Sequence, residues 1–328
     1  MDLPALVAPD SFKGTFSAPE IAAAIARGLR RGGREALELP VADGGEGTLD
    51  VVLDALGGEL VGATASDPLG RPIEATYARL PDGETALVES ARASGLGLVD
   101  EDERDAFAAS TRGTGELIAA AVEAGARRVV VTVGGSATTD GGAGALAALD
   151  DAGARCRLEV WCDVRTPWED APRVFGPQKG ADPETVERLE RRLAELARRA
   201  PKDPRGEPMT GAAGGLAGGL WAFRGARLLP GAPAVLNAIG FDEHMRGAAF
   251  VVTGEGRLDR QTFGGKLLFE VATRARQRGV ACHAVVGRNE IEPFEQRVLD
   301  LQSVREAGTE AMLEAAGEAI ARELAESI

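Results

Sequence analysis

Short apolar runs and longer amphipathic segments alternate along the whole chain. Ala5–Pro9, residues 129–133 and Ala281–Val286 are runs of small and β-branched apolar residues, the pattern of strands buried on both faces of a sheet. Leu267–Arg278 and residues 183–199 instead repeat apolar side chains at helical spacing, which predicts helices with one face toward a core. Strands and helices therefore alternate, and the sequence predicts an α/β fold.

Local signals indicate where several elements begin. Ser17 precedes an apolar-periodic segment that carries Pro19 in its first turn, and Asp182 stands directly before Pro183; both are typical of helix N-termini. Residues 60–80 alternate apolar and polar positions around Pro and Gly, which predicts antiparallel strands and entry into a second domain.

The chain is organised around residues 127–144, RRVVVTVGGSATTDGGAG, where a predicted strand runs into a glycine-rich turn and then a helix. Glycine lets the backbone approach a ligand closely, and the free amides of a helix N-terminus attract anions. We therefore expect Gly134, Gly135, Ser136 and Thr138 to bind phosphate, and Asp140 to hold a metal ion. A tight strand–helix turn in which Asp140 caps the helix explains this loop equally well.

Acidic residues follow other predicted strands as well, mostly in glycine-rich loops. They are Asp10, Asp43, Glu46, Asp163, Glu255 and Asp259. Phosphoryl transfer uses carboxylates to hold Mg²⁺, cations to stabilise phosphate charge, and one group to take the hydroxyl proton. The carboxyl ends of parallel strands share one edge of a sheet, where ligands bind. Any one of these acids could simply cap a helix or complete a turn, so only the set as a whole indicates chemistry.

Two of these acids differ in their setting. Asp163 ends a predicted strand in a Cys-Asp-Val context without glycine, which favours a role as proton acceptor. Asp43 shares a glycine turn with Glu46, which suits a hydrated metal ion. The opposite assignment of the two roles stays open at this point.

The basic residues are unevenly chosen: the chain holds 33 Arg and only 4 Lys. Lys13, Lys179 and Lys266 each stand beside glycine, whereas Lys202 lies in a proline-rich turn, residues 201–208, that reads as a linker. An ammonium group is a compact point charge and a guanidinium a wide planar fork. The three glycine-flanked lysines are therefore candidates for positions that require an ammonium group, with chance as the alternative.

Composition excludes several classes of function. The 328 residues carry a net charge of −14, which argues against nucleic acid or an anionic membrane as the main partner. Three Cys without a secretory leader suggest reduced thiols and a cytoplasmic location. Two distant His residues exclude a His-rich metal site, and Gly265-Lys266 is followed by Leu, so the P-loop motif is absent.

Eight motifs in this order resemble the type I glycerate kinases over nearly the whole chain. They are APDSFKGTFSA, ADGGEGT, GTGEL, VGGSATTDGGAG, CDV, FGPQKGA, GAAGGL and TGEGRLDRQTFGGK. The resemblance implies phosphorylation of D-glycerate to 2-phospho-D-glycerate with ATP and Mg²⁺. It also implies two α/β domains, one flavodoxin-like and one restriction-endonuclease-like, with the active site in the cleft between them. We place the first domain at residues 1–60 plus 225–328 and the inserted second domain at residues 61–224.

Combining the motif positions with their chemistry gives three expected sets of site residues. The catalytic set is Asp163, Lys13, Lys266 and Asp43. The substrate- and ATP-binding set is Asp10, Ser11, Gly134, Gly135, Ser136, Thr138, Gln178, Lys179, Glu255 and Asp259. The metal set is Asp43, Glu46 and Asp140.

The chain departs from the family pattern in two places, between residues 149 and 159 and after residue 287, where it is shorter than family members usually are. Neither departure touches a motif, so activity is not put in doubt, whereas substrate breadth and oligomeric contacts are. The expected partners are glycerate and ATP, with a homodimer left open. Two other functions stay open: a kinase for a related small hydroxy acid, and a nucleotide-binding regulatory protein without turnover.

Overall fold

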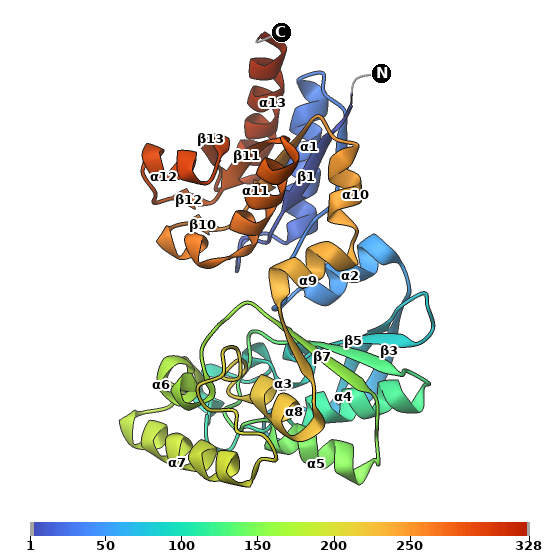
Figure 1. The fold of residues 1–328 in the computed structure, drawn as a ribbon, viewed down its shortest axis with the longest axis vertical. Coiled ribbons are helices and arrows are strands. Elements are labelled where there is room, and N and C mark those ends of the chain that lie inside the picture. The colour runs from blue at the N-terminus through green and yellow to red at the C-terminus, as the bar shows by residue number, and fades with distance from the viewer. Residues whose placement is uncertain (1–2, 327–328) are drawn as a thin grey trace. The chain divides into compact units, whose positions relative to one another are not determined.

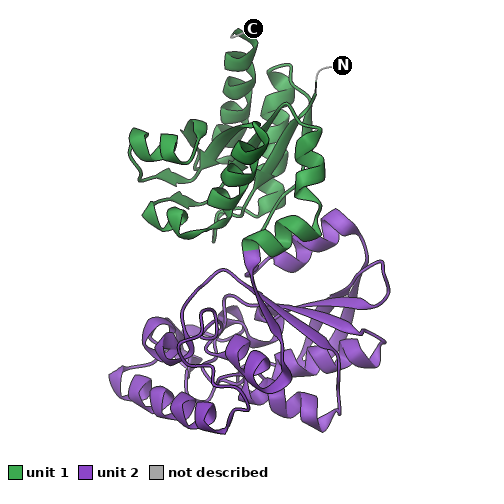
Figure 2. Cartoon of the chain, in the orientation of Figure 1, with its two compact units in different colours: residues 1–43, 232–328 green, residues 44–231 purple. Residues whose placement is uncertain are grey.

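The structure, a computed structural model, describes residues 3–326. Contacts divide the chain into two compact units, Met1–Asp43 with Ala232–Ile328, and Gly44–Gly231 (Figure 2). The sequence-based expectation placed the domain limits at residues 60 and 224 instead. Helix α2 (Thr48–Leu56) belongs to the second unit because it packs against two strands of that unit's sheet.

The first unit is built on a five-stranded parallel sheet with the strand order β13-β11-β9-β1-β2 (Figure 1). Its strands are β1 (Ala5–Pro9), β2 (Ala36–Glu38), β9 (Phe250–Gly254), β11 (Ala281–Val286) and β13 (Leu301–Glu306), and β10 (Arg257–Leu258) pairs separately with β12 (Arg288–Asn289). Numbered along the chain within this sheet, the order is 2-1-3-4-5, which is that of flavodoxin-like sheets. The topological switch point lies between β1 and β9, so a ligand site is expected where these two strands end.

Helices cover both faces of this sheet. The helices of the unit are α1 (Ala18–Arg31), α9 (Gly231–Ala238), α10 (Phe241–Arg246), α11 (Leu267–Arg278), α12 (Pro293–Val298) and α13 (Glu310–Glu326), with the 3₁₀ turn η5 (Arg260–Gly264). The core that includes Ala5, Val7 and Val252 is closed by α1 and α13. Since side chains alternate between the faces of a strand, α11, which contacts β9 and β11, covers the opposite face. Ser17 caps α1 in a capping box with Glu20, as its position predicted.

The second unit contains a six-stranded sheet whose strands follow their order in the chain, β3-β4-β5-β6-β7-β8. They are β3 (Glu59–Ser66), β4 (Pro72–Arg79), β5 (Thr85–Glu89), β6 (Arg128–Thr132), β7 (Arg157–Cys162) and β8 (Arg227–Pro230). The first three strands are antiparallel, which confirms the prediction for residues 60–80, and β5 to β8 are parallel. The carboxyl ends of β5, β6 and β7 therefore lie at one edge.

One face of this sheet is covered by α4, α5 and α8, whose side chains share a single core with it. The helices of the unit are α2, α3 (Ala91–Ser94), α4 (Arg112–Glu123), α5 (Ala143–Asp151), α6 (Ala171–Phe175), α7 (Pro183–Arg199) and α8 (Leu216–Arg224), with the 3₁₀ turns η1 (Leu96–Leu98), η2 (Glu101–Glu103), η3 (Trp168–Asp170) and η4 (Pro177–Lys179). Asp182 caps α7 by accepting the Thr185 amide at 2.7 Å, as predicted.

Residues 201–208 are not a linker between units, because they lie within the second one. The Thr210 hydroxyl donates to the carbonyl oxygens of Pro204 and Glu207 at 2.9 and 2.7 Å, which ties the segment down. The glycine-rich residues 211–219 run into α8, a helix that the sequence pattern did not predict because glycine is a poor helix former.

Glycine brings α1 and α13 into direct backbone contact. A Cβ atom at Gly28 would lie 1.9 Å from the Glu314 carbonyl oxygen, and one at Gly317 would lie 2.3 Å from the Ile25 carbonyl oxygen. Ion pairs from Arg27 and Arg31 to Glu314 flank this contact. Because the clash is with backbone atoms, no side-chain movement can relieve it.

We expect Gly28→Ala to lower the free energy of unfolding by about 1–3 kcal/mol, because the added methyl group forces the two helices apart. Urea unfolding measures this. Gly308→Ala is the matched control, since a Cβ atom there meets nothing within 4 Å, and it should change stability by less than about 0.5 kcal/mol. Equal stability of the two variants would show that close packing at Gly28 does not matter.

Candidate active site

A group of acidic side chains lies at the switch point of the first unit. Asp10 follows β1, and Glu255 follows β9, its neighbour in the sheet. Negative charge on Asp43 raises the pKa of both, so the three carboxyl groups are close enough to interact electrostatically. We refer to Asp10, Asp43 and Glu255 as the acidic group.

Burial sets the protonation of this group. It is the main cause that raises the pKa of Asp10 well above its ordinary value, although Asp10 accepts the Ser11 amide at 2.7 Å. Glu255 is 8% exposed, and burial raises its pKa to about 7, against the opposing hydrogen bond that it accepts from the Thr262 hydroxyl at 2.6 Å. A carboxyl group with a pKa near neutrality can both take up and release a proton at the pH of the cell.

Two of the three glycine-flanked lysines accompany the acidic group. Lys13 Nζ lies 3.1 Å from Asp43 Oδ2, and its side chain is 71% exposed. Lys266 is the N-cap residue of α11, with its Nζ atom 3.8 Å from Asp259 Oδ1. Both ammonium groups therefore lie beside carboxylates of the first unit.

A second group of predicted residues gathers at the carboxyl edge of the second unit's sheet. A Cβ atom at Gly134 would lie 2.9 Å from Gly45 Cα, and one at Gly135 would lie 2.7 Å from Glu46 Oε2. The two glycine-rich turns therefore touch, backbone against backbone. Glu46 and Gly135 are exposed there, as is Asp163, which directly follows β7.

Lys179 does not face solvent as a phosphate ligand would. It is 2% exposed, and its ammonium group donates to Ser136 Oγ at 3.0 Å and to the Thr138 carbonyl oxygen at 2.6 Å. Burial lowers its pKa to about 7. The structure thus makes Lys179 an internal support of the glycine-rich loop, while its neighbour Gln178 is exposed.

Asp140 is committed to the fold, which argues against its expected role as a metal ligand. Its oxygens accept the amides of Thr111, Gly142 and Gly144 at 2.9–3.0 Å and also the Thr111 hydroxyl. Since these donors lie at the N-termini of α4 and α5, Asp140 serves as a cap for two helices. Thr138 is fully buried, with no hydrogen-bond partner for its hydroxyl among residues 3–326, so a ligand cannot reach it in this conformation.

Two contributors to the second group were missed by sequence reasoning. Glu89 is buried and accepts the Gly47 and Leu49 amides at 3.0 and 3.1 Å, which caps α2. A Cβ atom at Gly214 would lie 1.9 Å from the Thr138 carbonyl oxygen, so the segment at 211–215 backs onto the glycine-rich loop. An acid ending the apolar run at residues 85–89 was the only signal for the first.

No group of three or more His, Cys, Asp or Glu side chains within residues 3–326 is arranged to hold a metal ion. Mg²⁺ in kinases needs only one or two carboxylates, since phosphates and water complete its shell. The acidic group fits this requirement, because the charge of Asp43 adds to burial in raising the pKa of Asp10 and Glu255, and a cation would relieve that repulsion. The three cysteines are free, and burial raises the pKa of their thiols to about 11 or 12, so they are poor metal ligands.

Burial of Lys179 should make stability depend on pH. The pKa of Lys179 is about 7 in the folded state, against an ordinary value of 10.5. Between these two pH values the unfolded chain binds more protons than the folded one. The free energy of unfolding should therefore rise with pH in this range, by at most about 1.4 kcal/mol per pH unit. Urea unfolding of the wild type and Lys179→Met at pH 6 to 9 should show this rise only in the wild type. Lys202→Met is the control, because it also removes an ammonium group, but from an exposed position over the Trp221 ring, 3.4 Å from the centroid. Parallel curves for wild type and Lys179→Met would refute the shift.

Known proteins are similar to this chain over most of its length. The model of the glycerate kinase family matches residues 5–152 and 149–327. Glycerate kinase from Bacillus subtilis (strain 168) is 40% identical over 324 residues, covering 86% of this chain and 84% of that protein. Glycerate 2-kinase from Escherichia coli (strain K12) is 38% identical, covering 83% and 82%.

A solved structure extends the similarity to the whole chain. The crystal structure of a protein assigned as glycerate kinase 2 from Salmonella typhimurium LT2 superposes with a TM-score of 0.86 at 32% identity. The alignment covers 100% of this chain and 99% of that one. Within residues 3–326, the helices are all too short or too polar to span a membrane. Sequence family and fold thus agree, and the chain belongs to the glycerate kinase family of phosphotransferases.

Proposed function

We propose that the protein transfers the γ-phosphoryl group of ATP to D-glycerate and releases 2-phospho-D-glycerate and ADP. The observation that carries this proposal is the placement of Asp10, Asp43 and Glu255, with Lys13 and Lys266, in the switch-point unit. Phosphoryl transfer needs carboxylates for a metal ion and fixed cations for phosphate oxygens. The name of the Escherichia coli relative, glycerate 2-kinase, supports the position of the acceptor hydroxyl.

Asp10 and Asp43 would hold Mg²⁺, since both belong to the acidic group and carboxylate oxygens are ligands that Mg²⁺ prefers. When bound, Mg²⁺ neutralises negative charge on the phosphates. Lys13 and Lys266 would bind phosphate oxygens and stabilise the charge that develops on them. Both side chains extend from glycine-rich turns and are at least 38% exposed, so they are accessible to a ligand.

The second group would bind ligand oxygens through backbone amides and Ser136. Amides of glycine-rich turns bind phosphate or carboxylate oxygens. Lys179 would fix the loop through Ser136 and Thr138 without touching the ligand, which accounts for its burial. Glu46 remains a proposed binding residue because it is exposed beside the glycine-rich loop. Gln178 remains one because it is exposed next to Lys179 in the chain.

For the proton acceptor, the chemistry favours Glu255 over Asp163, the residue expected from sequence. A general base works best when its pKa lies near the working pH. Burial raises the pKa of Glu255 to about 7. At neutral pH its carboxyl group is therefore ionised in a large fraction of the molecules and can accept a proton. Asp163 keeps a role in binding substrate, through its exposed position after β7.

The reaction is tested by ADP release from ATP with a panel of small hydroxy acids. Strong release with D-glycerate alone, together with carbon NMR signals of the 2-phosphate, is the expected result. Release with another hydroxy acid would assign a different substrate on the same scaffold. Tight ATP binding without release under any acid would contradict turnover and favour a regulatory nucleotide-binding protein.

Substitution separates the two candidates for the proton acceptor. We expect Glu255→Gln to lower kcat by about 10²–10⁴-fold and to remove the fall in rate below pH 7, since the group that must lose a proton is gone. Asp163→Asn should lower activity but keep that fall. Rate profiles from pH 5.5 to 9 decide between them. If Asp163→Asn removes the fall while Glu255→Gln keeps it, Asp163 is the proton acceptor.

A further inference from the structure

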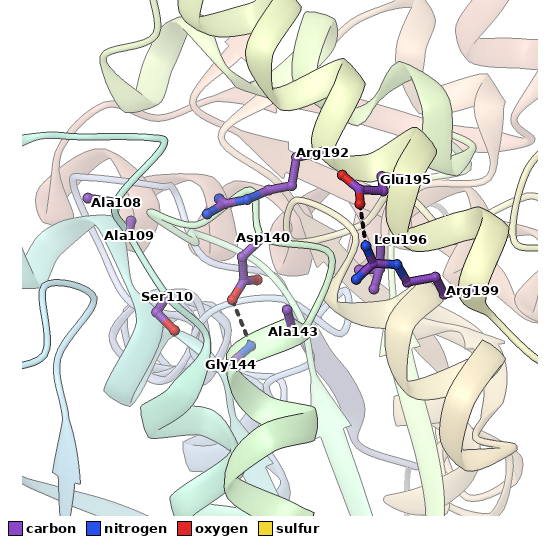
Figure 3. A pocket seen from close by; sticks show the side chains of 10 residues that line it. All are labelled: Ala108, Ala109, Ser110, Asp140, Ala143, Gly144, Arg192, Glu195, Leu196 and Arg199. Carbon is purple, nitrogen blue, oxygen red and sulfur yellow. Dashed lines mark hydrogen bonds and ion pairs between the residues drawn. The ribbon is translucent and has the colours of Figure 1, made fainter.

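A pocket in the second unit is lined by none of the residues that we assign to the reaction. Its volume is about 370 Å³, and its walls come from α7, the N-terminal turn of α5 and residues 108–110. This volume is at the low end of small-molecule sites. Figure 3 shows Arg192, Glu195 and Arg199 projecting from α7 toward Ser110 and Gly144 on the opposite wall.

The Arg192 side chain is held in place and keeps most of its donors. Its guanidinium stacks on the Phe107 ring, 4.4 Å from the centroid, and one N–H donates to the Phe107 carbonyl oxygen at 2.9 Å. Within residues 3–326 the structure gives this guanidinium no acidic partner. A guanidinium carries five N–H groups, so a fork preorganised for an oxyanion faces the pocket.

The other charged groups of the lining are Arg199, Glu195 and Asp140. Arg199 pairs with Glu195, four residues earlier on the same helix, and both side chains are more than half exposed, so this pair is weak and an anion can compete for Arg199. The Asp140 carboxylate accepts backbone amides at the N-termini of α4 and α5. The amides there are occupied, and the cationic side chains of α7 are left to attract a ligand.

We propose that this pocket binds a small organic anion with two negative charges, a phosphate ester or a dicarboxylate, at a site distinct from that of phosphoryl transfer. The two guanidiniums would hold the oxyanion, and the Ser110 hydroxyl would donate to it. Alanine and leucine side chains on the walls leave room for a short carbon skeleton. The lining contains no lysine, and its buried carboxylate, Asp140, accepts backbone amides, so the site binds and does no chemistry.

The ligand would stabilise the glycine-rich turn that begins at Gly134. Asp140 and Gly144 belong to the turn that begins at Gly134, and Asp140 fixes that turn to α4. An anion between α7 and this turn would therefore stabilise the conformation in which Lys179 supports Ser136. The expected readouts are binding at the pocket and a higher melting temperature of the protein.

Isothermal titration calorimetry with inorganic phosphate and with malonate, at constant ionic strength in chloride, tests the proposal. We expect saturable binding of at least one anion, and which one binds decides between a phosphate and a dicarboxylate ligand. Arg192→Gln and Arg199→Gln should each weaken it about tenfold or more, since each removes a charged hydrogen-bond donor. Glu195→Gln should strengthen it, because Arg199 then loses its competing partner.

Two controls make the outcome decisive. Arg198→Gln, an exposed neighbour on α7 outside the lining, should bind as the wild type does, and so should Lys266→Met in the first unit. No saturable binding of either anion would overturn the proposal. So would equal weakening by Arg198→Gln, which would indicate general charge attraction, or loss of binding in Lys266→Met alone, which would place the anion at the phosphoryl-transfer residues. Turnover of D-glycerate is measured separately and is independent of this result.

Discussion

The parallel pairing of β1 with β9 is the contact on which the first unit depends. It joins residues far apart in the chain: the Thr253 hydroxyl donates to the Ala8 carbonyl oxygen across 245 positions. The pairing creates the switch point of the sheet, and it brings Asp10 beside Glu255. Without it, neither the raised pKa of these carboxyl groups nor their interaction with Asp43 would exist, so the chemistry of the first unit is a consequence of a long-range strand pair.

The second unit buries two ionisable side chains next to its glycine-rich loop. Asp140 and Lys179 are both within the interior, and each is satisfied in a different way. Four donors from two helix N-termini compensate the Asp140 carboxylate, whereas burial shifts Lys179 toward its neutral form. Burial disfavours the charged form of an amine, and for Lys179 two neutral oxygen partners do not offset that cost. Both solutions hold the same glycine-rich loop.

Local signals in the sequence sufficed for elements with clear ends. The structure has the predicted bounds for Ala5–Pro9, Leu267–Arg278 and Ala281–Val286, because glycine or an apolar run marks their limits. Strand β13 was missed because its middle carries Gln302, Ser303 and Arg305, and only the neighbouring strand makes them part of a sheet. The motifs led to the proposed site residues, but no sequence pattern indicates that Lys179 is buried or that Asp140 accepts several backbone hydrogen bonds. Those properties arise from partners such as Thr111, which only the folded chain brings into contact.

The first unit is discontinuous, and this has a consequence for how the protein is made. During synthesis the second unit, Gly44–Gly231, is complete before β9, β11 and β13 have left the ribosome. Domains generally fold as units, in the order in which they emerge. The nascent chain must therefore carry β1, α1 and β2 as an unfinished sheet, with an apolar strand open to other chains, while nearly two hundred residues fold behind it. A chaperone that shields the N-terminal strand would act during that interval.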